Sequence, residues 1–123
     1  MPERTTPPAA PGALAPEDAK IVTLARSARA RTRAAEGAAV RDLDGRTYAG
    51  ATVGLASLQV SALGVAVAMA VSSAARGLEA VAVVGSGDSV SDADLAAVRD
   101  LAGPGVPVYR CTPDGTVSER LTS

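Results

Sequence analysis

The sequence predicts an α/β domain in which a mixed β-sheet of about five strands lies between helices, a three-layer α-β-α sandwich. Three observations predict this fold. The stretch 47–75 contains no charged residue, and its apolar, small-residue centre is typical of a buried helix. Residues 80–84 form a continuous apolar run, which is typical of a strand covered on both faces. Asp44-Gly45 predicts a hairpin, because both residues tolerate the positive φ of a two-residue turn.

The first helix is predicted from Pro16 to about Ala35. Proline suits the first helical turn, and the acidic side chains of Glu17 and Asp18 favour the positive end of a helix. The apolar side of this helix consists of Ile21, Val22, Leu24, Ala25 and Ala28.

The central helix is predicted within the sequence SLQVSALGVAVAMAVSSAA, residues 57–75, and is expected to end near Arg76-Gly77, since glycine commonly stops helices. Its continuous apolar part covers only 60–71, whereas a membrane span needs about 20 apolar residues. The sequence therefore predicts a buried helix with no solvated face and no membrane span.

The other elements follow from local patterns. Ser91 is expected to cap the last helix, with Asp94 three residues later as a weaker form of the capping box. The predicted elements are strands over 37–43, 47–53, 80–84 and 106–111, a helix over 92–101, and a closing segment over 116–121.

Composition indicates one domain. The 123 residues include 47% hydrophobic side chains, and the net charge of −1 gives no overall attraction to nucleic acid or anionic lipid. Residues 1–15 are rich in proline and alanine, which predicts a disordered tail before a folded domain over 16–123. The single cysteine excludes an internal disulfide and fits the reducing cytoplasm, which we expect as the location of this protein.

Composition also limits the chemistry. A catalytic zinc needs three good protein ligands and one open position, but the chain has no histidine and one cysteine. The sequence therefore predicts no metal site within a subunit and no cofactor. The acidic cluster Asp88, Asp92 and Asp94 lies where acids favour a helix start. Cys111 is expected to be a small buried hydrophobe, and Gly85-Ser86-Gly87 lacks the fuller patterns of phosphate-binding loops.

Three arginines share one face of the first helix. Arg26, Arg29 and Arg33 recur at i, i+3 and i+7, so this face could contact phosphates. A solvated face near the negative end of the helix is the favoured interpretation. Nucleic-acid binders usually show a stronger basic excess and stacking aromatic side chains.

Several segments resemble the small, homo-oligomeric cytidine deaminases. GAAVRDLDGRTYAGATVGLAS, residues 37–57, resembles their early hairpin and the approach to their zinc helix. AVAVVGSG, residues 80–87, resembles the following strand, and PVYRCTPDGTVSERL, residues 107–121, resembles the last strand, its Asp-Gly turn and the closing segment. The resemblance covers about residues 17–121 and implies the cytidine-deaminase-like three-layer sandwich.

The family's chemical residues are missing from the matching positions. The resemblance implies an aromatic near the base, Asn and Glu on the ribose, a zinc-binding Cys and a catalytic Glu at the start of the central helix, and two more zinc-binding Cys in the next helix. In that order these positions are held here by Ala34, Thr52, Gly54, Leu63, Val65, Ala93 and Ala96. The sequence thus resembles a degenerate member that lacks the zinc and catalytic motifs.

These observations favour a catalytically inactive deaminase-like protein that acts as a non-catalytic scaffold, regulatory or binding subunit. Two alternatives stay open, a nucleoside hydrolase of the deaminase type with residual activity and an RNA- or ribosome-associated module that uses the arginine face. We expect a homo-oligomer, a dimer or tetramer, formed through the uncharged central helix as the resemblance implies. A separate protein partner is a further open alternative.

Overall fold

The computed structural model describes residues 14–87 and 89–123. Its main sheet has five strands in the order β2-β1-β5-β6-β7. β5 and β6 run parallel, whereas the other neighbouring strands run antiparallel. The predicted mixed sheet is therefore confirmed. The strands of this sheet are β1 (Glu36–Asp42), β2 (Thr47–Ala51), β5 (Leu78–Gly85), β6 (Pro107–Cys111) and β7 (Val117–Thr122). The predicted disordered tail lies, up to residue 13, outside the described residues.

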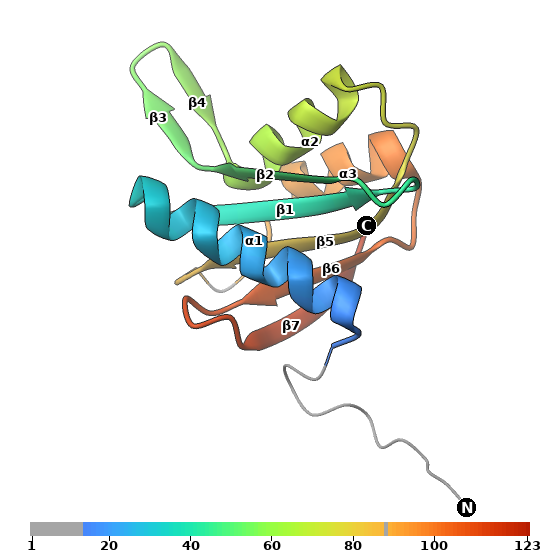
Figure 1. Ribbon diagram of the computed structural model, residues 1–123. Helices are drawn as coiled ribbons and strands as arrows, with labels where there is room; N and C mark the ends of the chain where they lie inside the picture. Colours follow the sequence, from blue (N-terminus) through green and yellow to red (C-terminus); the bar gives the residue numbers. More distant parts are fainter. Residues whose placement is uncertain (1–13, 88) are drawn as a thin grey trace, which may run out of the picture.

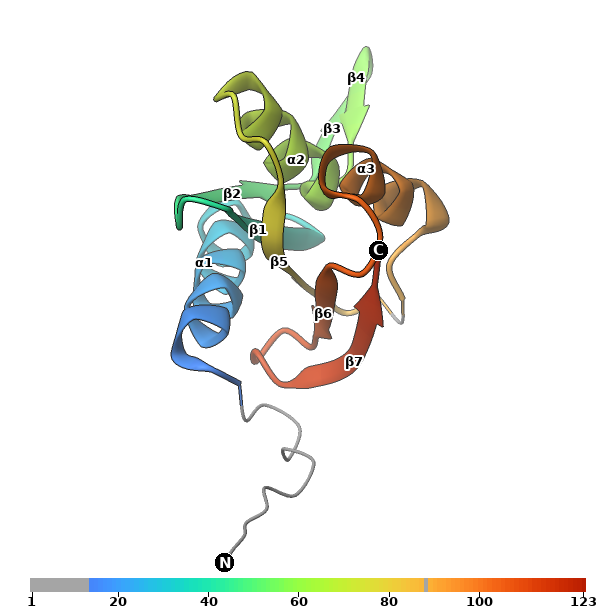
Figure 2. The ribbon, with the colours of Figure 1, turned by 90° about the vertical axis from the view of Figure 1, so that its right-hand side faces the viewer.

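Helices cover both faces of the sheet, as Figures 1 and 2 show. α1 (Pro16–Thr32) lies on one face, and α2 (Ala62–Ser72) and α3 (Asp92–Ala102) lie on the other. Alternate residues of β5 enter two separate apolar cores: Val81 and Val83 face α2 and α3, whereas Ala82 and Val84 face α1. The predicted three-layer sandwich is confirmed, and so is the strand that is covered on both faces.

α1 begins as the sequence predicts, with proline in its first turn and Glu17 and Asp18 near its positive end. It ends at Thr32, about three residues before the predicted end. Arg33 adopts a left-handed conformation with φ 57°, and its backbone N–H bonds the carbonyl oxygens of the last turn. The left-handed conformation of Arg33 ends α1 at Thr32, although the residues that follow are also predicted to be helical.

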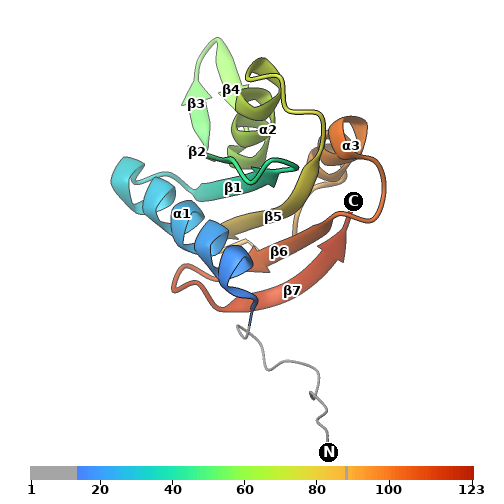
Figure 3. The same ribbon diagram turned by 45° about the vertical axis from the view of Figure 1, so that its right-hand side comes forward.

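The prediction for the central helix is wrong at both ends. Residues 53–60 instead form a second hairpin, β3 (Val53–Leu55) and β4 (Leu58–Val60), which extends beyond the main sheet near α2 (Figures 1 and 3). The helix cannot extend backwards because Ser61, with ψ 157°, is extended and caps α2. At the other end α2 stops at Ser72, and Ala74 has a positive φ of 67°, so the turn precedes Gly77.

The predicted absence of a solvated face on this helix is also wrong for the single chain. Ala62, Leu63 and Ala66 are buried against the sheet, but Met69 and Val71 are 40% and 54% exposed. Within residues 14–87 and 89–123, no helix is long and apolar enough to cross a membrane.

Each of the two tyrosines joins a carboxylate. The Tyr48 hydroxyl donates to Asp42 Oδ2 over 2.9 Å on the α2 side of the sheet. The Tyr109 hydroxyl donates to Asp18 Oδ2 over 2.8 Å and so ties β6 to α1. The buried carboxylate of Asp42 also accepts the backbone N–H groups of Asp44 and Arg46 at 2.9 Å each, which fixes the hairpin turn.

Asp42 should make the stability of the fold depend on pH. Burial raises the pKa of this carboxyl, but the hydrogen bonds from Tyr48 and from the turn outweigh burial and hold the pKa below its ordinary value. A carboxyl with a lowered folded-state pKa stabilises the fold above its unfolded pKa, and this stabilisation disappears as pH falls through the folded-state pKa.

We therefore expect Asp42→Asn to lower the melting temperature near neutral pH. The difference from wild type should shrink as the pH falls from about 7 to about 2, because the wild-type carboxyl then becomes protonated as well. Thermal melts across this range measure the effect, with Asp100→Asn at an exposed site on α3 as the control. A difference that stays constant down to the lowest pH would contradict the role assigned to Asp42.

Candidate functional site

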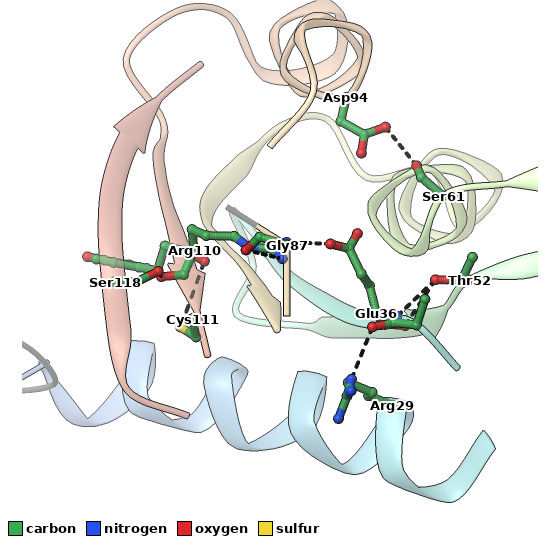
Figure 4. A network of polar contacts seen from close by, with 11 residues as sticks. Arg29, Glu36, Thr52, Ser61, Gly87, Asp94, Arg110, Cys111 and Ser118 are labelled. Carbon is green, nitrogen blue, oxygen red and sulfur yellow. Dashed lines mark hydrogen bonds and ion pairs between the residues drawn. The ribbon is translucent and has the colours of Figure 1, made fainter. Parts of the chain in front are cut away.

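The N-termini of α2 and α3 meet at one place. Ser61 caps α2 by accepting the Gly64 N–H at 2.9 Å, and Ser91 caps α3 by accepting the Asp94 N–H at 3.1 Å. The Ser61 hydroxyl also donates to Asp94 Oδ1 over 2.7 Å, so a side-chain hydrogen bond joins the two helix starts (Figure 4). Both serines satisfy backbone N–H groups that a helix start leaves unpaired. The predicted Ser91 cap is present.

An open pocket of about 320 Å³ borders this junction. Its lining comes from the β3–β4 hairpin and the start of α2, and includes Thr52, Gly54, Gln59 and Ser61. Thr52 is held in place by Glu36, whose backbone N–H donates to the Thr52 hydroxyl oxygen at 3.1 Å. The chemistry that faces this pocket is therefore hydroxyl and amide chemistry.

The structure brings together only part of the sequence-predicted set. Thr52 and Gly54 lie in the pocket, and Ala93 is exposed at the start of α3. Leu63 and Val65 are the second and fourth residues of α2 rather than its start. Leu63 is 1% exposed in the core.

The other predicted positions lie apart from the lining of this pocket. The Val65 side chain packs over Gly50, where an added Cβ would lie 2.6 Å from Val65 Cγ1. Ala34 is half-buried just after α1, and Ala96 is half-buried on α3.

Ser61 is the residue that sequence reasoning missed. The predicted helix begins too early, so Ser61 falls inside it and not at its N-cap. The available signal was local, because a serine directly before an apolar run is a typical N-cap. The segment Leu58–Val60, which precedes Ser61, obscures this signal. It is too short for its hydrophobic pattern to distinguish a strand from a helix.

A second polar group lies under the loop that follows β5. The Arg110 side chain is 1% exposed, and its Nη1 contacts Glu36 Oε2 at 2.5 Å. Arg110 Nε and Nη2 both donate to the Gly87 carbonyl oxygen, at 3.0 and 2.8 Å (Figure 4). A buried charge needs such partners, so Glu36 and Gly87 explain how an arginine can occupy a buried position in β6.

This arrangement also explains the Gly85-Ser86-Gly87 sequence. A β-carbon added to Gly87 would lie 2.9 Å from Arg110 Nη2, and one added to Gly85 would lie 2.9 Å from Glu36 Cγ. The two glycines therefore allow the loop to close over the buried ion pair. The sequence analysis identified neither Arg110 nor Glu36, although an arginine within the apolar sequence PVYRC was the available signal.

The described residues offer little to a metal. Within residues 14–87 and 89–123, no group of three or more histidine, cysteine or acidic side chains lies close enough to hold an ion. In the predicted acidic cluster, Asp94 bonds Ser61, Asp92 opens α3, and Asp88 lies outside the described residues. Cys111 is buried as predicted, and burial raises the pKa of its thiol to about 11, which keeps it protonated.

Only two of the three arginines of the predicted face lie together. Arg26 is exposed, and Arg29 Nε donates to the Ala35 carbonyl oxygen over 3.1 Å. Arg33 is the left-handed residue that ends α1. Arg26 and Arg29 line a common pocket, and Arg33 does not belong to that lining.

Comparison with known proteins decides the family. Residues 14–115 match the family model described as cytidine deaminase-like. The chain belongs to the cytidine deaminase-like family. A comparison with curated protein sequences gives no match.

Solved structures of cytidine deaminases share the fold of this cytidine deaminase-like chain. The enzyme from Burkholderia pseudomallei superposes with a TM-score of 0.71 at 22% identity, over 85% of this chain and 89% of its own. The enzyme from Mycobacterium leprae gives 0.66 at 23% identity, over 84% and 90%. A single-residue mutant of the Mycobacterium tuberculosis enzyme gives 0.64 at 25% identity, over 72% and 81%.

Removal of one partner of the buried ion pair should strongly destabilise this cytidine deaminase-like domain. Arg110→Met keeps the aliphatic bulk but leaves the Glu36 carboxylate and the Gly87 carbonyl without their donors. We expect a loss of about 3 kcal/mol in the free energy of unfolding, the lower end for a broken buried pair, because Glu36 is partly exposed.

Denaturant unfolding measures this loss. Arg46→Met is the matched control, because Arg46 and Asp44 form an exposed pair at 3.5 Å, for which about 1 kcal/mol or less is expected. Equal losses of unfolding free energy in the two variants would show that the buried Arg110 pair matters no more to stability than the exposed Arg46 pair.

Proposed function

We propose that this protein is a catalytically inactive member of the cytidine deaminase-like family that acts as a non-catalytic scaffold, regulatory or binding subunit. The observation that carries the proposal is the Ser61–Asp94 hydrogen bond between the two helix starts. The family resemblance places metal-binding and acid-base groups at the starts of these helices. Here the same place holds the Ser61 hydroxyl and the Asp94 carboxylate, which already accepts a hydrogen bond from that hydroxyl.

The residues present do not fit a catalytic zinc. The chain has no histidine, and its single cysteine, Cys111, packs in the core between the sheet and α1. Ser61 and Asp94 lie on the opposite face of the sheet, at the starts of α2 and α3. One subunit therefore cannot supply three good ligands at this junction.

The position of the missing glutamate supports the same proposal. The resemblance puts the zinc-binding cysteine at the start of the central helix and the catalytic glutamate two residues later. The Ser61 cap at the start of α2 supports assigning these two positions to Ser61 and Leu63 in place of Leu63 and Val65. Leu63 has no ionisable group and packs in the apolar core, so it cannot transfer a proton to a substrate.

The exposed surface of α2 and the β3–β4 hairpin supports a role in assembly. Leu55 and Leu58 on the hairpin are 60% and 54% exposed, and Met69 and Val71 on α2 also face outward. No charged residue interrupts this part of the chain. Exposed apolar groups without charge are typical of interaction surfaces, and a two-stranded hairpin is only marginally stable alone. We propose a homo-oligomer, a dimer or tetramer, formed through this surface.

Metal content and deaminase activity test the catalytic part of the proposal. We expect purified protein to contain no stoichiometric zinc by elemental analysis and to release no ammonia from cytidine, because the ligands and the acid-base group are missing. An active small cytidine deaminase assayed in parallel is the control. Stoichiometric zinc together with ammonia release would contradict the proposal and favour residual deaminase activity.

Mass in solution tests the assembly part. Light scattering should give a dimer or tetramer for the wild type and a smaller species for Met69→Glu combined with Val71→Glu, which buries two charges in the interface. Ala19→Glu on the exposed side of α1 is the control and should leave the mass unchanged. A monomeric wild type at high protein concentration would refute this part.

A further inference from the structure

A second open pocket lies between α1 and the turn that joins β6 to β7. Its volume is about 240 Å³, and its lining consists of Thr23, Arg26, Ser27, Arg29, Ala30 and Pro113. Figure 3 shows this turn next to α1. The pocket is on the α1 side of the sheet, away from Ser61 and Asp94.

Positive charge dominates the α1 wall of this pocket. The second half of α1 contains three arginines, a fourth follows the helix at position 33, and no acidic residue lies between 24 and 35. Two of them, Arg26 and Arg29, line the pocket, and neither forms an ion pair with another described residue. Thr23 and Ser27 belong to the same lining, and the Thr23 hydroxyl donates to the Ala19 carbonyl oxygen over 3.2 Å, which leaves the Ser27 hydroxyl as the hydroxyl donor of this wall. Guanidinium and hydroxyl donors together are typical of sites for phosphate oxygens.

Neighbouring contacts position both arginines. The bond from Arg29 Nε to the Ala35 carbonyl oxygen orients its guanidinium and leaves the terminal nitrogens available. The Arg26 side chain packs over the β6–β7 turn, where a β-carbon added to Gly115 would lie 2.8 Å from Arg26 Cδ. A preorganised guanidinium loses less side-chain entropy when it binds a ligand.

One carboxylate lies near this pocket. Asp114 Oδ1 accepts the Thr112 hydroxyl at 2.5 Å and the Thr116 N–H at 2.9 Å, so the side chain is held within its own turn. Asp114 and Arg26 interact electrostatically. This carboxylate neutralises part of the positive charge, which leaves an excess of about one unit from the two lining arginines.

We propose that this pocket binds the phosphate or pyrophosphate group of a small phosphorylated molecule. Arg26 and Arg29 pair with its oxygens, and the Ser27 hydroxyl donates a further hydrogen bond. The volume lies below the range of about 300–1,000 Å³ for drug-sized ligands, so the pocket holds only the charged group and the rest of the ligand extends into solvent.

The same residues argue against an extended RNA strand as the ligand. Sequence-tolerant binding of single strands uses aromatic side chains on which bases stack. The only aromatic residues of the chain, Tyr48 and Tyr109, are buried and bonded to carboxylates. Arg33, which the sequence grouped with the pocket arginines, does not line the pocket. A compact anion requires only the two arginines that do.

Calorimetric titration of the full chain with inorganic pyrophosphate at low ionic strength tests the proposal. We expect saturable binding that weakens about tenfold or more in Arg26→Gln, equivalent to about 1.4 kcal/mol or more. Arg31→Gln removes the same charge from an exposed position on the same helix that does not line the pocket, and it should change the affinity less than about twofold. Asp114→Asn should tighten binding, because it removes the nearby negative charge.

Three results would overturn this inference. The first is the absence of pyrophosphate binding, and the second is an equal loss in Arg26→Gln and Arg31→Gln, which would mean unspecific attraction to a basic helix. The third is binding of a single-stranded RNA oligomer that pyrophosphate does not displace, which would assign the face to RNA. Each readout is independent of zinc content and of assembly, so the proposed function can fail while this inference holds.

Discussion

Close packing of helices onto glycine residues is the constraint on which this structure depends. A β-carbon at Gly37 would lie 2.0 Å from the Ala25 carbonyl oxygen of α1, and one at Gly50 would lie 2.6 Å from Val65 Cγ1 of α2. Both distances are far inside van der Waals contact, so helices on opposite faces of the sheet touch strand backbone directly. A core of alanine, valine and leucine without phenylalanine or tryptophan can fill only such a narrow space at native density.

Most of the fold could be predicted from the sequence because its strongest signals are local. The apolar strand β5, the proline at the start of α1 and Gly45, with a positive φ of 84°, each determine conformation through their own residues. The predicted two-residue form of the Asp44-Gly45 turn is wrong, because Asp44 has no positive φ and the Asp42 N–H bonds the Arg46 carbonyl oxygen across a longer turn. The β3–β4 hairpin could not be predicted in the same way. Its two strands of three residues are shorter than one reliable period of a pattern, and pairing between them depends on contacts that a sequence window does not contain.

The candidate site was less predictable, because its polar groups come from distant parts of the chain. Ser61 and Asp94 are 33 residues apart, and Arg110 and Glu36 are 74 residues apart. Composition alone shows that the chain has no histidine and one cysteine, and this count needs no register. Placement of the individual positions did need a register, and the unpredicted hairpin delays the start of α2 from about residue 57 to Ala62. The glycines of the Gly85-Ser86-Gly87 loop were visible, but their partner Arg110 was recognised only in three dimensions.

The tyrosine–aspartate pairs give each helical layer its own optical reporter. In a chain without tryptophan, all near-ultraviolet aromatic absorption comes from Tyr48 on the α2 side and Tyr109 on the α1 side. The hydrogen bond to Asp42 raises the pKa of Tyr48, and burial together with Asp18 raises the pKa of Tyr109. Detachment of α1 would return Tyr109 alone to its ordinary alkaline titration, whereas opening of the β1–β2 hairpin would release Tyr48. Spectrophotometric titration can therefore distinguish loosening of one layer from loosening of the other.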